Sequence, residues 1–200
     1  MADTLKVVPP GGGTERATHP PPDDLFAAAG VKKGDILAGR YRVEDVLGVG
    51  GMGAVVSTVH VQLGTRFAIK LVRPAALRAE YVVERFLREA RAASRLTSPN
   101  VARIFDIGRL ENGCPYMVME LLEGHDLKSL LHKNGGPLDP AMAADCIAQA
   151  CRALAEAHLG GIVHRDLKPS NLFLVTRGPH AGTVKVLDFG ISKFLVPAAP

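Results

Sequence analysis

The sequence predicts an α+β fold made of two lobes, a β-rich lobe followed by a mainly helical one. Short valine-rich runs at residues 41–47, 54–61 and 66–72 are separated by glycines, a pattern typical of antiparallel strands. One amphipathic helix is predicted at residues 79–96, and helical character becomes dominant only after Gly124. Strands gathered in the first half and helices in the second indicate segregated rather than alternating elements.

The remaining elements follow from apolar runs and from helix-capping residues. Short apolar runs predict further strands at residues 102–107, 116–120, 172–175 and 184–187. A short helix is expected at residues 126–132. A longer helix begins at Asp139, an N-cap residue that is followed by proline at the first helical position, and it ends at Gly160.

Composition divides the chain into three segments. Residues 1–38 are rich in proline and glycine and show little apolar periodicity. Such a segment cannot bury enough apolar surface to offset its loss of conformational entropy, so we expect a flexible leader. The β-rich lobe is predicted at residues 39–122 and the helical lobe at residues 123–200.

Bulk composition argues against several classes of protein. The net charge is only +4 and tryptophan is absent, so we expect no nucleic-acid partner. No apolar run is long enough to span a membrane, and the N-terminus lacks a signal pattern. Cys114, Cys146 and Cys151 do not have the spacing of a zinc site and are interpreted as reduced thiols. A cytoplasmic location is therefore expected.

A glycine-rich run lies between the first two predicted strands. Gly48, Gly50 and Gly53 form the pattern G-x-G-x-x-G, and Val55 follows them. Glycines let a tight turn approach phosphates closely, because a Cβ atom would hold the backbone away. The same spacing occurs in dinucleotide folds, where it joins a strand to a helix. Here Val55 begins a second strand, which argues against that alternative.

A lysine and a glutamate are predicted to form an ion pair. Lys70 ends an apolar strand, and Glu89 falls inside the apolar arc of the helix at residues 79–96. A carboxylate on this face is costly to bury without a cationic partner, and Lys70 is a fitting one. The alternative is that Glu89 extends into solvent beside Arg85 and Arg88.

Two polar segments in the second half carry groups that could bind a metal or move a proton. The run from His164 to Asn171 reads H-R-D-L-K-P-S-N and places Asp166 and Asn171 in one loop between a helix and a strand. Further on, Asp188 stands at a strand end and is followed by phenylalanine and glycine. This position suits a metal ligand, although the same residues also occur in ordinary turns.

Together, these motifs resemble the protein kinase family from Tyr41 to about Lys193. Their order, spacing and structural context agree with the kinase signature. Lys168 is typical of the Ser/Thr class, and the glycine run Gly-Gly-Met-Gly is similar to that of bacterial members. The resemblance implies a two-lobed protein-kinase-like fold, with residues 39–122 as its N-lobe and residues 123–200 as part of its C-lobe, ending in the activation segment.

The resemblance implies ATP and Mg²⁺ as cofactors and assigns a nucleotide-binding set. Backbone N–H groups of the glycine run would cover the phosphates, and Lys70, held by Glu89, would bind two of them. The glycines are Gly48, Gly50, Gly51 and Gly53. Four apolar side chains would enclose the adenine: Leu47, Val55, Ala68 and Phe173. The hinge backbone at Glu120 and Leu122 would bind the adenine edge, with Met119 as gatekeeper behind it.

The resemblance also implies catalytic and metal-binding roles. Asp166 would accept the proton of a serine or threonine hydroxyl on a protein substrate, and Lys168 would approach the γ-phosphate. Asn171 and Asp188 would hold Mg²⁺. The chain would therefore be an ATP-dependent Ser/Thr protein kinase.

Two alternatives to a kinase stay open at this point. No A-P-E motif follows Asp188, so the chain could be an inactive nucleotide-binding or interaction fragment. A small-molecule phosphotransferase is disfavoured by the Lys168-Pro169 pair and by the glycine run. The helix after Asp139 carries an apolar stripe that needs a partner, from which we expect marginal stability, association and little phosphotransfer. The stripe consists of Met142, Cys146, Ile147, Ala150 and Leu154.

Overall fold

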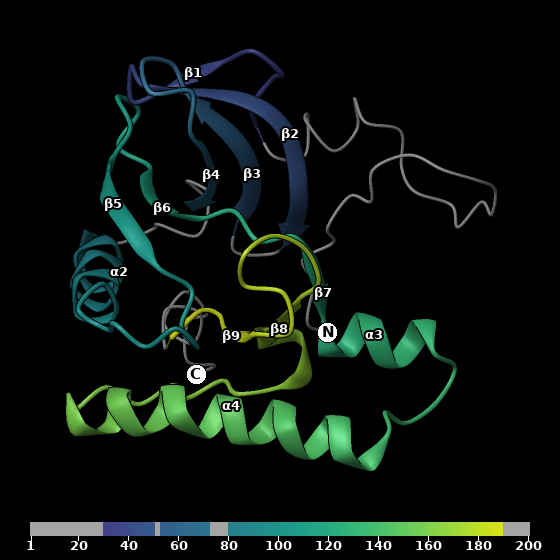
Figure 1. The fold of residues 1–200 in the computed structure, drawn as a ribbon. Coiled ribbons are helices and arrows are strands. Elements are labelled where there is room, and N and C mark those ends of the chain that lie inside the picture. Colours follow the sequence, from purple (N-terminus) through teal and green to yellow (C-terminus); the bar gives the residue numbers. More distant parts are fainter. Residues whose placement is uncertain (1–29, 51–52, 73–79, 190–200) are drawn as a thin grey trace, which may run out of the picture.

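A β-sheet forms most of the first lobe. The computed structural model describes residues 30–50, 53–72 and 80–189. Within these ranges the lobe has a six-stranded antiparallel sheet in the order β1-β2-β3-β4-β6-β5 (Figure 1). Its strands are β1 (Ile36–Leu37), β2 (Tyr41–Gly50), β3 (Gly53–His60), β4 (Arg66–Val72), β5 (Ile104–Arg109) and β6 (Pro115–Glu120). The predicted meander is confirmed, and the short strand β1 was not anticipated.

One helix, α2 (Glu80–Ala93), packs against this sheet. It lies beside β5 and β6, as Figure 1 shows. Val83, Phe86 and Ala90 are buried on its inner face, as the periodicity of the sequence predicted. They form a core cluster with Met117 of β6 and Val72 of β4. The helix is thus fixed to the strand that carries Lys70.

In the described residues, the second lobe combines helices with a small sheet. Its helices are α3 (Leu127–Lys133) and α4 (Pro140–Leu159), and a single 3₁₀ turn, η2, covers Pro169–Asn171. Strands β7 (Gly124–Asp126), β8 (Leu172–Val175) and β9 (Val184–Val186) form an antiparallel sheet in that order. The α+β class and the two lobes are confirmed.

Capping residues set the ends of the two helices. The Asp139 carboxylate accepts hydrogen bonds from the backbone N–H groups of Ala141 and Met142 at the start of α4, as predicted. Asp126, which the sequence placed inside a helix, instead caps α3 by accepting the N–H of Ser129 at 2.9 Å. Asp126 is also the last residue of β7, in which a Cβ on Gly124 would lie 2.1 Å from the Leu174 carbonyl oxygen. Only glycine lets β7 approach β8 so closely.

The apolar stripe of α4 divides into a covered part and an exposed part. Cys146 and Ala150 are buried in a core cluster with Val184 and Val186 of β9. The prediction that they lack a partner is therefore wrong, because the small β7-β8-β9 sheet covers them. Leu154 is half-buried, and two other members of the stripe are exposed: Met142 at 37% and Ile147 at 53%.

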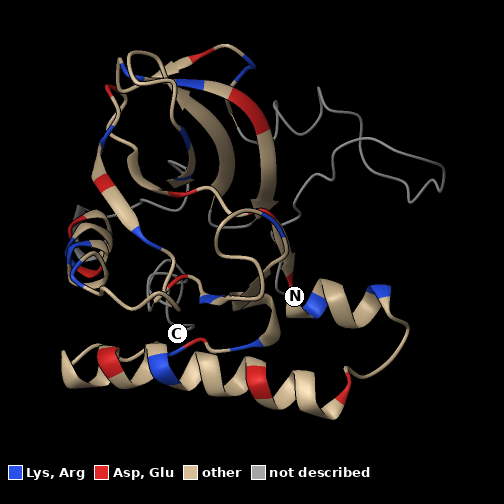
Figure 2. Ribbon diagram, in the orientation of Figure 1, with Lys and Arg blue, Asp and Glu red and all other residues tan. Residues whose placement is uncertain are grey.

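Charged residues of both signs are scattered along the ribbon of both lobes (Figure 2). Some form local ion pairs, such as Arg40 with Asp106 at 3.0 Å. Within the described ranges, none of the helices is both long and apolar enough to cross a membrane.

Candidate active site

The glycine run lies in the hairpin between β2 and β3, as predicted. Gly50 and Gly53 pair across the hairpin, while Gly51 lies outside the described residues. Gly53 has a positive φ of 154°, and a Cβ there would lie 1.8 Å from the carbonyl oxygen of Leu71 in β4. The absence of a side chain at Gly53 therefore lets β3 and β4 pack together, a role that the sequence pattern did not suggest.

Lys70 reaches across to the strand end that carries Asp188. It lies in β4 between Val55 of β3 and Met117 of β6. Its Nζ donates to Asp188 Oδ1 at 2.6 Å, and the two side chains are only 12% and 16% exposed. The structure thus pairs Lys70 with Asp188 rather than with the predicted partner Glu89, which is half-buried in α2. The helical periodicity pointed to Glu89, and it could not indicate that Asp188, 118 residues from Lys70, would supply the carboxylate.

Asp166, Lys168 and Asn171 meet in the loop that precedes β8. Lys168 Nζ donates to Asp166 Oδ2 at 2.8 Å. The Asn171 side-chain amide donates to the Asp166 carbonyl oxygen at 2.8 Å and to its Oδ2 at 3.3 Å. Because the NH₂ of Asn171 faces Asp166, its amide oxygen lies on the opposite side of the group. The three residues that the sequence predicted to act together are therefore in contact.

His164 connects this loop with the residue before Asp188. Its Nε2 lies 2.8 Å from the Leu187 carbonyl oxygen, and its Nδ1 accepts the backbone N–H of Asp166 at 3.3 Å. Since Nδ1 is the acceptor, Nε2 carries the hydrogen and donates to Leu187. Burial lowers the pKa of His164, which favours this neutral form. The ring also packs against Phe189, with the centroids 4.9 Å apart.

Two residues of the site adopt a left-handed backbone that is unusual for a side chain other than glycine. Arg165 has a φ of 62° and Asp188 a φ of 55°. Such conformations cost about 1–3 kcal/mol each and persist only where the surrounding contacts enforce them. Arg165 directly precedes Asp166, and Asp188 is the carboxylate partner of Lys70. The backbone strain is therefore located where the polar groups of the site meet.

The predicted adenine-binding residues lie on four strands, three in the first lobe and one in the second. Leu47, Val55 and Ala68 come from β2, β3 and β4. Phe173 of β8 is buried at 3% in a cluster that includes the partly buried Leu122. Glu120 ends β6, and its carboxylate accepts from the Arg103 N–H at 2.8 Å and from Lys185 Nζ at 2.7 Å.

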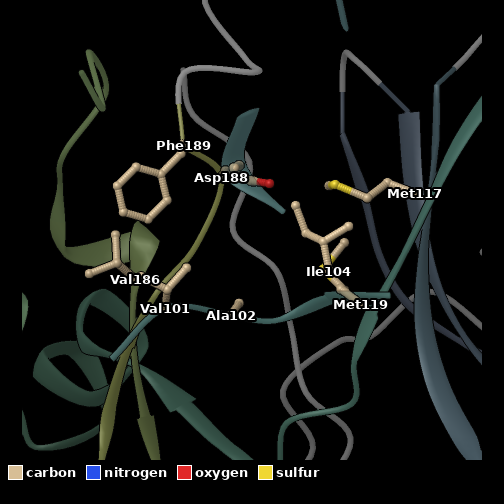
Figure 3. Close-up of a pocket in the computed structure, with 9 residues that line it drawn as sticks. Val101, Ala102, Ile104, Met117, Met119, Val186, Asp188 and Phe189 are labelled. Atoms are coloured by element: carbon tan, nitrogen blue, oxygen red, sulfur yellow. The ribbon is translucent and has the colours of Figure 1, made fainter. Parts of the chain in front are cut away.

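A small apolar pocket lies beside Met119, the residue before Glu120 (Figure 3). Met117 and Met119 of β6 line one side, and Phe189 lies on the other side beside β9. Figure 3 shows the Asp188 carboxylate directed toward the methionine side. The predicted gatekeeper Met119 and the predicted metal ligand Asp188 thus border the same cavity. The other lining residues are Ala93, Val101, Ala102, Ile104 and Val186.

The acidic groups at the site fit Mg²⁺ only in combination with phosphate oxygens. In the described part of the chain, no three His, Cys, Asp or Glu side chains form a group that could hold a metal ion. Mg²⁺ is commonly bound by one or two carboxylates together with the phosphates of a nucleotide. Asp188 and the amide oxygen of Asn171 match that incomplete set of ligands.

Comparison with known proteins agrees with this geometry. The model of the protein kinase domain matches residues 41–199. The chain belongs to the protein kinase family. This kinase domain is 41% identical over 160 residues to the serine/threonine-protein kinase pkn3 of Myxococcus xanthus. It is also 41% identical over 171 residues to the serine/threonine-protein kinase PknA of Mycobacterium tuberculosis. The matched parts cover 80% and 84% of this chain but only 29% and 38% of the two relatives.

Solved structures show the same likeness. The crystal structure of the Mycobacterium tuberculosis PknI kinase domain is similar with a TM-score of 0.70 and 28% identity. The match covers 82% of this chain and 62% of that one. The bacterial Ser/Thr class that the resemblance predicted is therefore confirmed for the family.

The kinase domain also holds polar residues at its centre that the sequence analysis did not single out. Lys185 of β9 is only 4% exposed, and Asn100 and Gln149 are buried as well. A lysine flanked by two valines, and a glutamine beside Ala150 on an otherwise apolar helix face, were the available signals. Their partners lie far away in the sequence, so the pattern alone could not assign them a role.

Proposed function

We propose that this kinase domain transfers the γ-phosphoryl group of ATP to serine or threonine hydroxyls of protein substrates, with Mg²⁺ as the metal. One observation carries the proposal: Lys70 and Asp188, 118 residues apart in the sequence, meet at 2.6 Å across the two lobes. This contact supports the proposal, because a cation that would bind phosphate and a carboxylate that would bind the metal then lie at one point. The Asp166, Lys168 and Asn171 group lies on the adjoining loop.

The nucleotide-binding roles follow the layout of the first lobe. Backbone N–H groups of Gly48, Gly50 and Gly51 would cover the phosphates, with Gly53 keeping β3 close to β4. Lys70 would exchange its contact with Asp188 for the phosphates, and Glu89 would then orient it. The adenine would lie among Leu47, Val55, Ala68 and Phe173, against Met119 and the hinge backbone of Glu120 and Leu122.

The catalytic roles follow the loop that begins at His164. Asp166 would accept the proton of the substrate hydroxyl, because its carboxylate is fixed by Lys168 and Asn171. Lys168 would place its positive charge near the transferred phosphoryl group. Asn171 and Asp188 would hold Mg²⁺, which neutralises charge on the phosphate oxygens when it is bound.

The segments predicted from composition supply the setting for this site. We propose that residues 39–122 act as the N-lobe and that the C-lobe begins at residue 123, since β7 starts at Gly124. The described cysteines, Cys114, Cys146 and Cys151, are free thiols, which fits a domain working in the reducing, ATP-containing cytoplasm.

A phosphotransfer assay tests the proposal. The chain is incubated with radiolabelled ATP, Mg²⁺ and a generic Ser/Thr substrate such as casein, and the labelled residues are identified. Asp166→Asn serves as the control, because it keeps the shape of the side chain but cannot accept the proton. Transfer to serine or threonine that is lost in Asp166→Asn supports the proposal, whereas transfer that persists in this variant contradicts the role of Asp166.

A second candidate is a nucleotide-binding domain without transferase activity. The exposed positions Met142 and Ile147 of α4 favour it, because an incompletely covered lobe gives a poorly fixed catalytic loop. ATP binding without any transfer to casein in the same assay would select this alternative.

A further inference from the structure

The strand that leads to Asp188 is held by side chains from outside its own sheet. In β9 the Val184 N–H donates to Gln149 Oε1 at 2.8 Å, and the Val184 carbonyl accepts from Asn100 Nδ2 at 2.9 Å. The next contacts are backbone ones: Val186 N–H donates to the Asn100 carbonyl, and the Val186 carbonyl accepts from Ala102 N–H. The α2–β5 connection and α4 thus hold β9 from both sides.

Gln149 is the centre of this arrangement, because its amide group is fully used. Its Oε1 also accepts from Asn100 Nδ2 at 3.0 Å. Its Nε2 donates to Asp145 Oδ2 at 2.8 Å and to the Gly182 carbonyl at 3.1 Å. Gln149 is only 7% exposed, so each of these bonds compensates for the loss of water. Only a side chain that both donates and accepts can bond Val184 N–H and the Gly182 carbonyl together.

The contacts continue without interruption to Asp188. The Leu187 N–H donates to the Asn171 carbonyl at 2.9 Å, and the Leu187 carbonyl accepts from His164 Nε2. Asp188 then adopts its positive φ of 55°. A strained residue keeps its conformation only while the preceding backbone is fixed. The hydrogen bonds at Val184 and Val186 provide that constraint at the start of the segment.

An ordinary structural role explains this network less well. A buried glutamine that only satisfied its own polar atoms could do so with partners anywhere in the core. Here the side-chain amides of Asn100 and Gln149 both form hydrogen bonds with the backbone of Val184. The backbone of Asn100 and Ala102 also forms hydrogen bonds with Val186. Their hydrogen bonds act on one strand, whose next residues are Leu187 and Asp188.

We propose that Gln149, together with Asn100, is a positioning residue that sets the Asp188 carboxylate for Mg²⁺ bound with a nucleoside triphosphate. The inference deepens the proposed function and rests on Asp188 being a metal ligand. Gln149 touches neither metal nor nucleotide and acts through β9. Its loss should therefore weaken the metal-dependent part of nucleotide binding and spare the part that Lys70 and the glycine hairpin supply.

The test compares nucleotide affinity with and without metal. The Kd of mant-ATP for the chain is measured by fluorescence in Mg²⁺ and again in EDTA, and the ratio of the two is the metal enhancement. Gln149→Leu keeps the size of the side chain but removes its amide. We expect this variant to reduce the enhancement by roughly 10-fold or more, as is usual for residues that orient a metal ligand, with the Kd in EDTA unchanged.

A rescue variant separates positioning from simple loss of stability. In the double variant Asp145→Asn/Gln149→Glu, the side chain at position 145 becomes the donor and the side chain at position 149 becomes the acceptor. A carboxylate oxygen at position 149 can still accept from the Val184 N–H and from Asn100 Nδ2. The double variant still leaves the Gly182 carbonyl without the donor that Gln149 supplies, so it should recover part of the enhancement that Gln149→Glu loses. Gln149→Glu alone places a second carboxylate beside Asp145 and should lose it. The single and double variants also decide the matter if Gln149→Leu does not melt cooperatively.

Leu130→Ala is the matched control, because Leu130 of α3 packs partly buried against the same core but does not contact β9 through hydrogen bonds. It should lower the melting temperature and leave the metal enhancement unchanged. Wild-type enhancement in Gln149→Leu, no rescue by the double variant, or an equal loss in Leu130→Ala would each overturn the inference. A wild-type chain that binds mant-ATP equally in Mg²⁺ and EDTA would instead refute the proposed metal role of Asp188, and the inference with it.

Discussion

Lys70 Nζ and Asp188 Oδ1 lie 2.6 Å apart, which joins the central strand of the first lobe to the end of β9 in the second. Both side chains are largely buried, so the attraction between the charges is weakly screened by water. The pair places a cation and a carboxylate where phosphates and a metal would compete for them. We therefore expect a bound nucleotide to replace the contact between Lys70 and Asp188 rather than to leave it in place.

The first prediction concerns the cation of this pair. Lys70→Met keeps an unbranched apolar stem but removes the charge, so it should weaken ATP binding and lower any turnover by roughly 10²–10³-fold, a typical effect of losing one charge-stabilising group. Kinetics at saturating ATP and a mant-ATP titration measure the two effects. Arg42→Met is the control, because Arg42 pairs with Glu44 on the exposed surface. Turnover equal to that of the unmodified chain would disprove the role of Lys70.

The second prediction concerns the carboxylate. Asp188→Asn retains the shape of the side chain and an oxygen but loses the charge that Mg²⁺ requires. The affinity for ATP should then no longer depend on Mg²⁺, as measured by titration calorimetry with and without the metal. An unchanged Mg²⁺ dependence in Asp188→Asn would exclude Asp188 as a ligand.

The third prediction concerns Gly53. A Cβ here would lie 1.8 Å from the Leu71 carbonyl oxygen, so Gly53→Ala must push β3 away from β4. We expect a loss of roughly 3 kcal/mol, at the upper end of the usual range for single substitutions, and a fall in melting temperature of about 2–4 °C per kcal/mol. Gly113→Ala is the control: its φ of 81° is also positive, but a Cβ there would meet no atom within 4 Å. A smaller loss in Gly53→Ala than in Gly113→Ala would contradict the packing role.

The fourth prediction concerns pH. Burial lowers the pKa of His164 below its ordinary value of about 6.5, so the folded protein binds the proton less readily than the unfolded chain. The stability that this neutral histidine contributes is fully present above pH about 6.5 and is lost as the pH falls toward its folded pKa. Protonation would also take Nδ1 away from the Asp166 N–H.

Thermal melts between pH about 5 and 8 measure this effect. The fall in melting temperature on the acid side should be smaller in His164→Gln, whose amide does not titrate. Identical pH profiles for the two proteins would show that His164 does not determine the acid sensitivity.

Patterns of apolar residues predicted most of the fold because each strand and helix buries a face that its own sequence defines. The alternation in β2, β3 and β4 and the 3.6-residue period of α2 are local properties. The short strands β1 and β7 escaped notice because they hold only 2 and 3 residues, too few for any period to appear.

The site was predictable to the extent that its motifs are local. The contact between Asp166, Lys168 and Asn171 lies within one loop, and the sequence placed those residues together. The structure pairs Lys70 with Asp188 rather than with the predicted Glu89, because a contact between residues so far apart in the chain depends on the folded backbone. The same reason hides Gln149, since its partners Val184 and Asn100 come from two other segments of the chain.

The fifth prediction concerns the outer side of α4. Ile147 is 53% exposed and Met142 37% exposed, and both belong to the predicted stripe. Each large apolar side chain left in water forgoes about 1.5–3 kcal/mol of burial, against a total stability of only about 5–15 kcal/mol for a domain. The 200-residue chain should therefore be marginally stable, associate with increasing concentration and show little phosphotransfer.

Light scattering over a concentration series and a thermal melt measure these properties. Met142→Gln/Ile147→Gln should reduce association and leave the melting temperature nearly unchanged, because these side chains contribute little to the core while exposed. Cys146→Gln, one residue away but buried at 2%, is the contrasting variant and should lower the melting temperature strongly. A monomeric, cooperatively melting chain with robust phosphorylation of casein would contradict the prediction. Association that persists in the Met142→Gln/Ile147→Gln variant would show that the chains associate through a surface other than these two residues of α4.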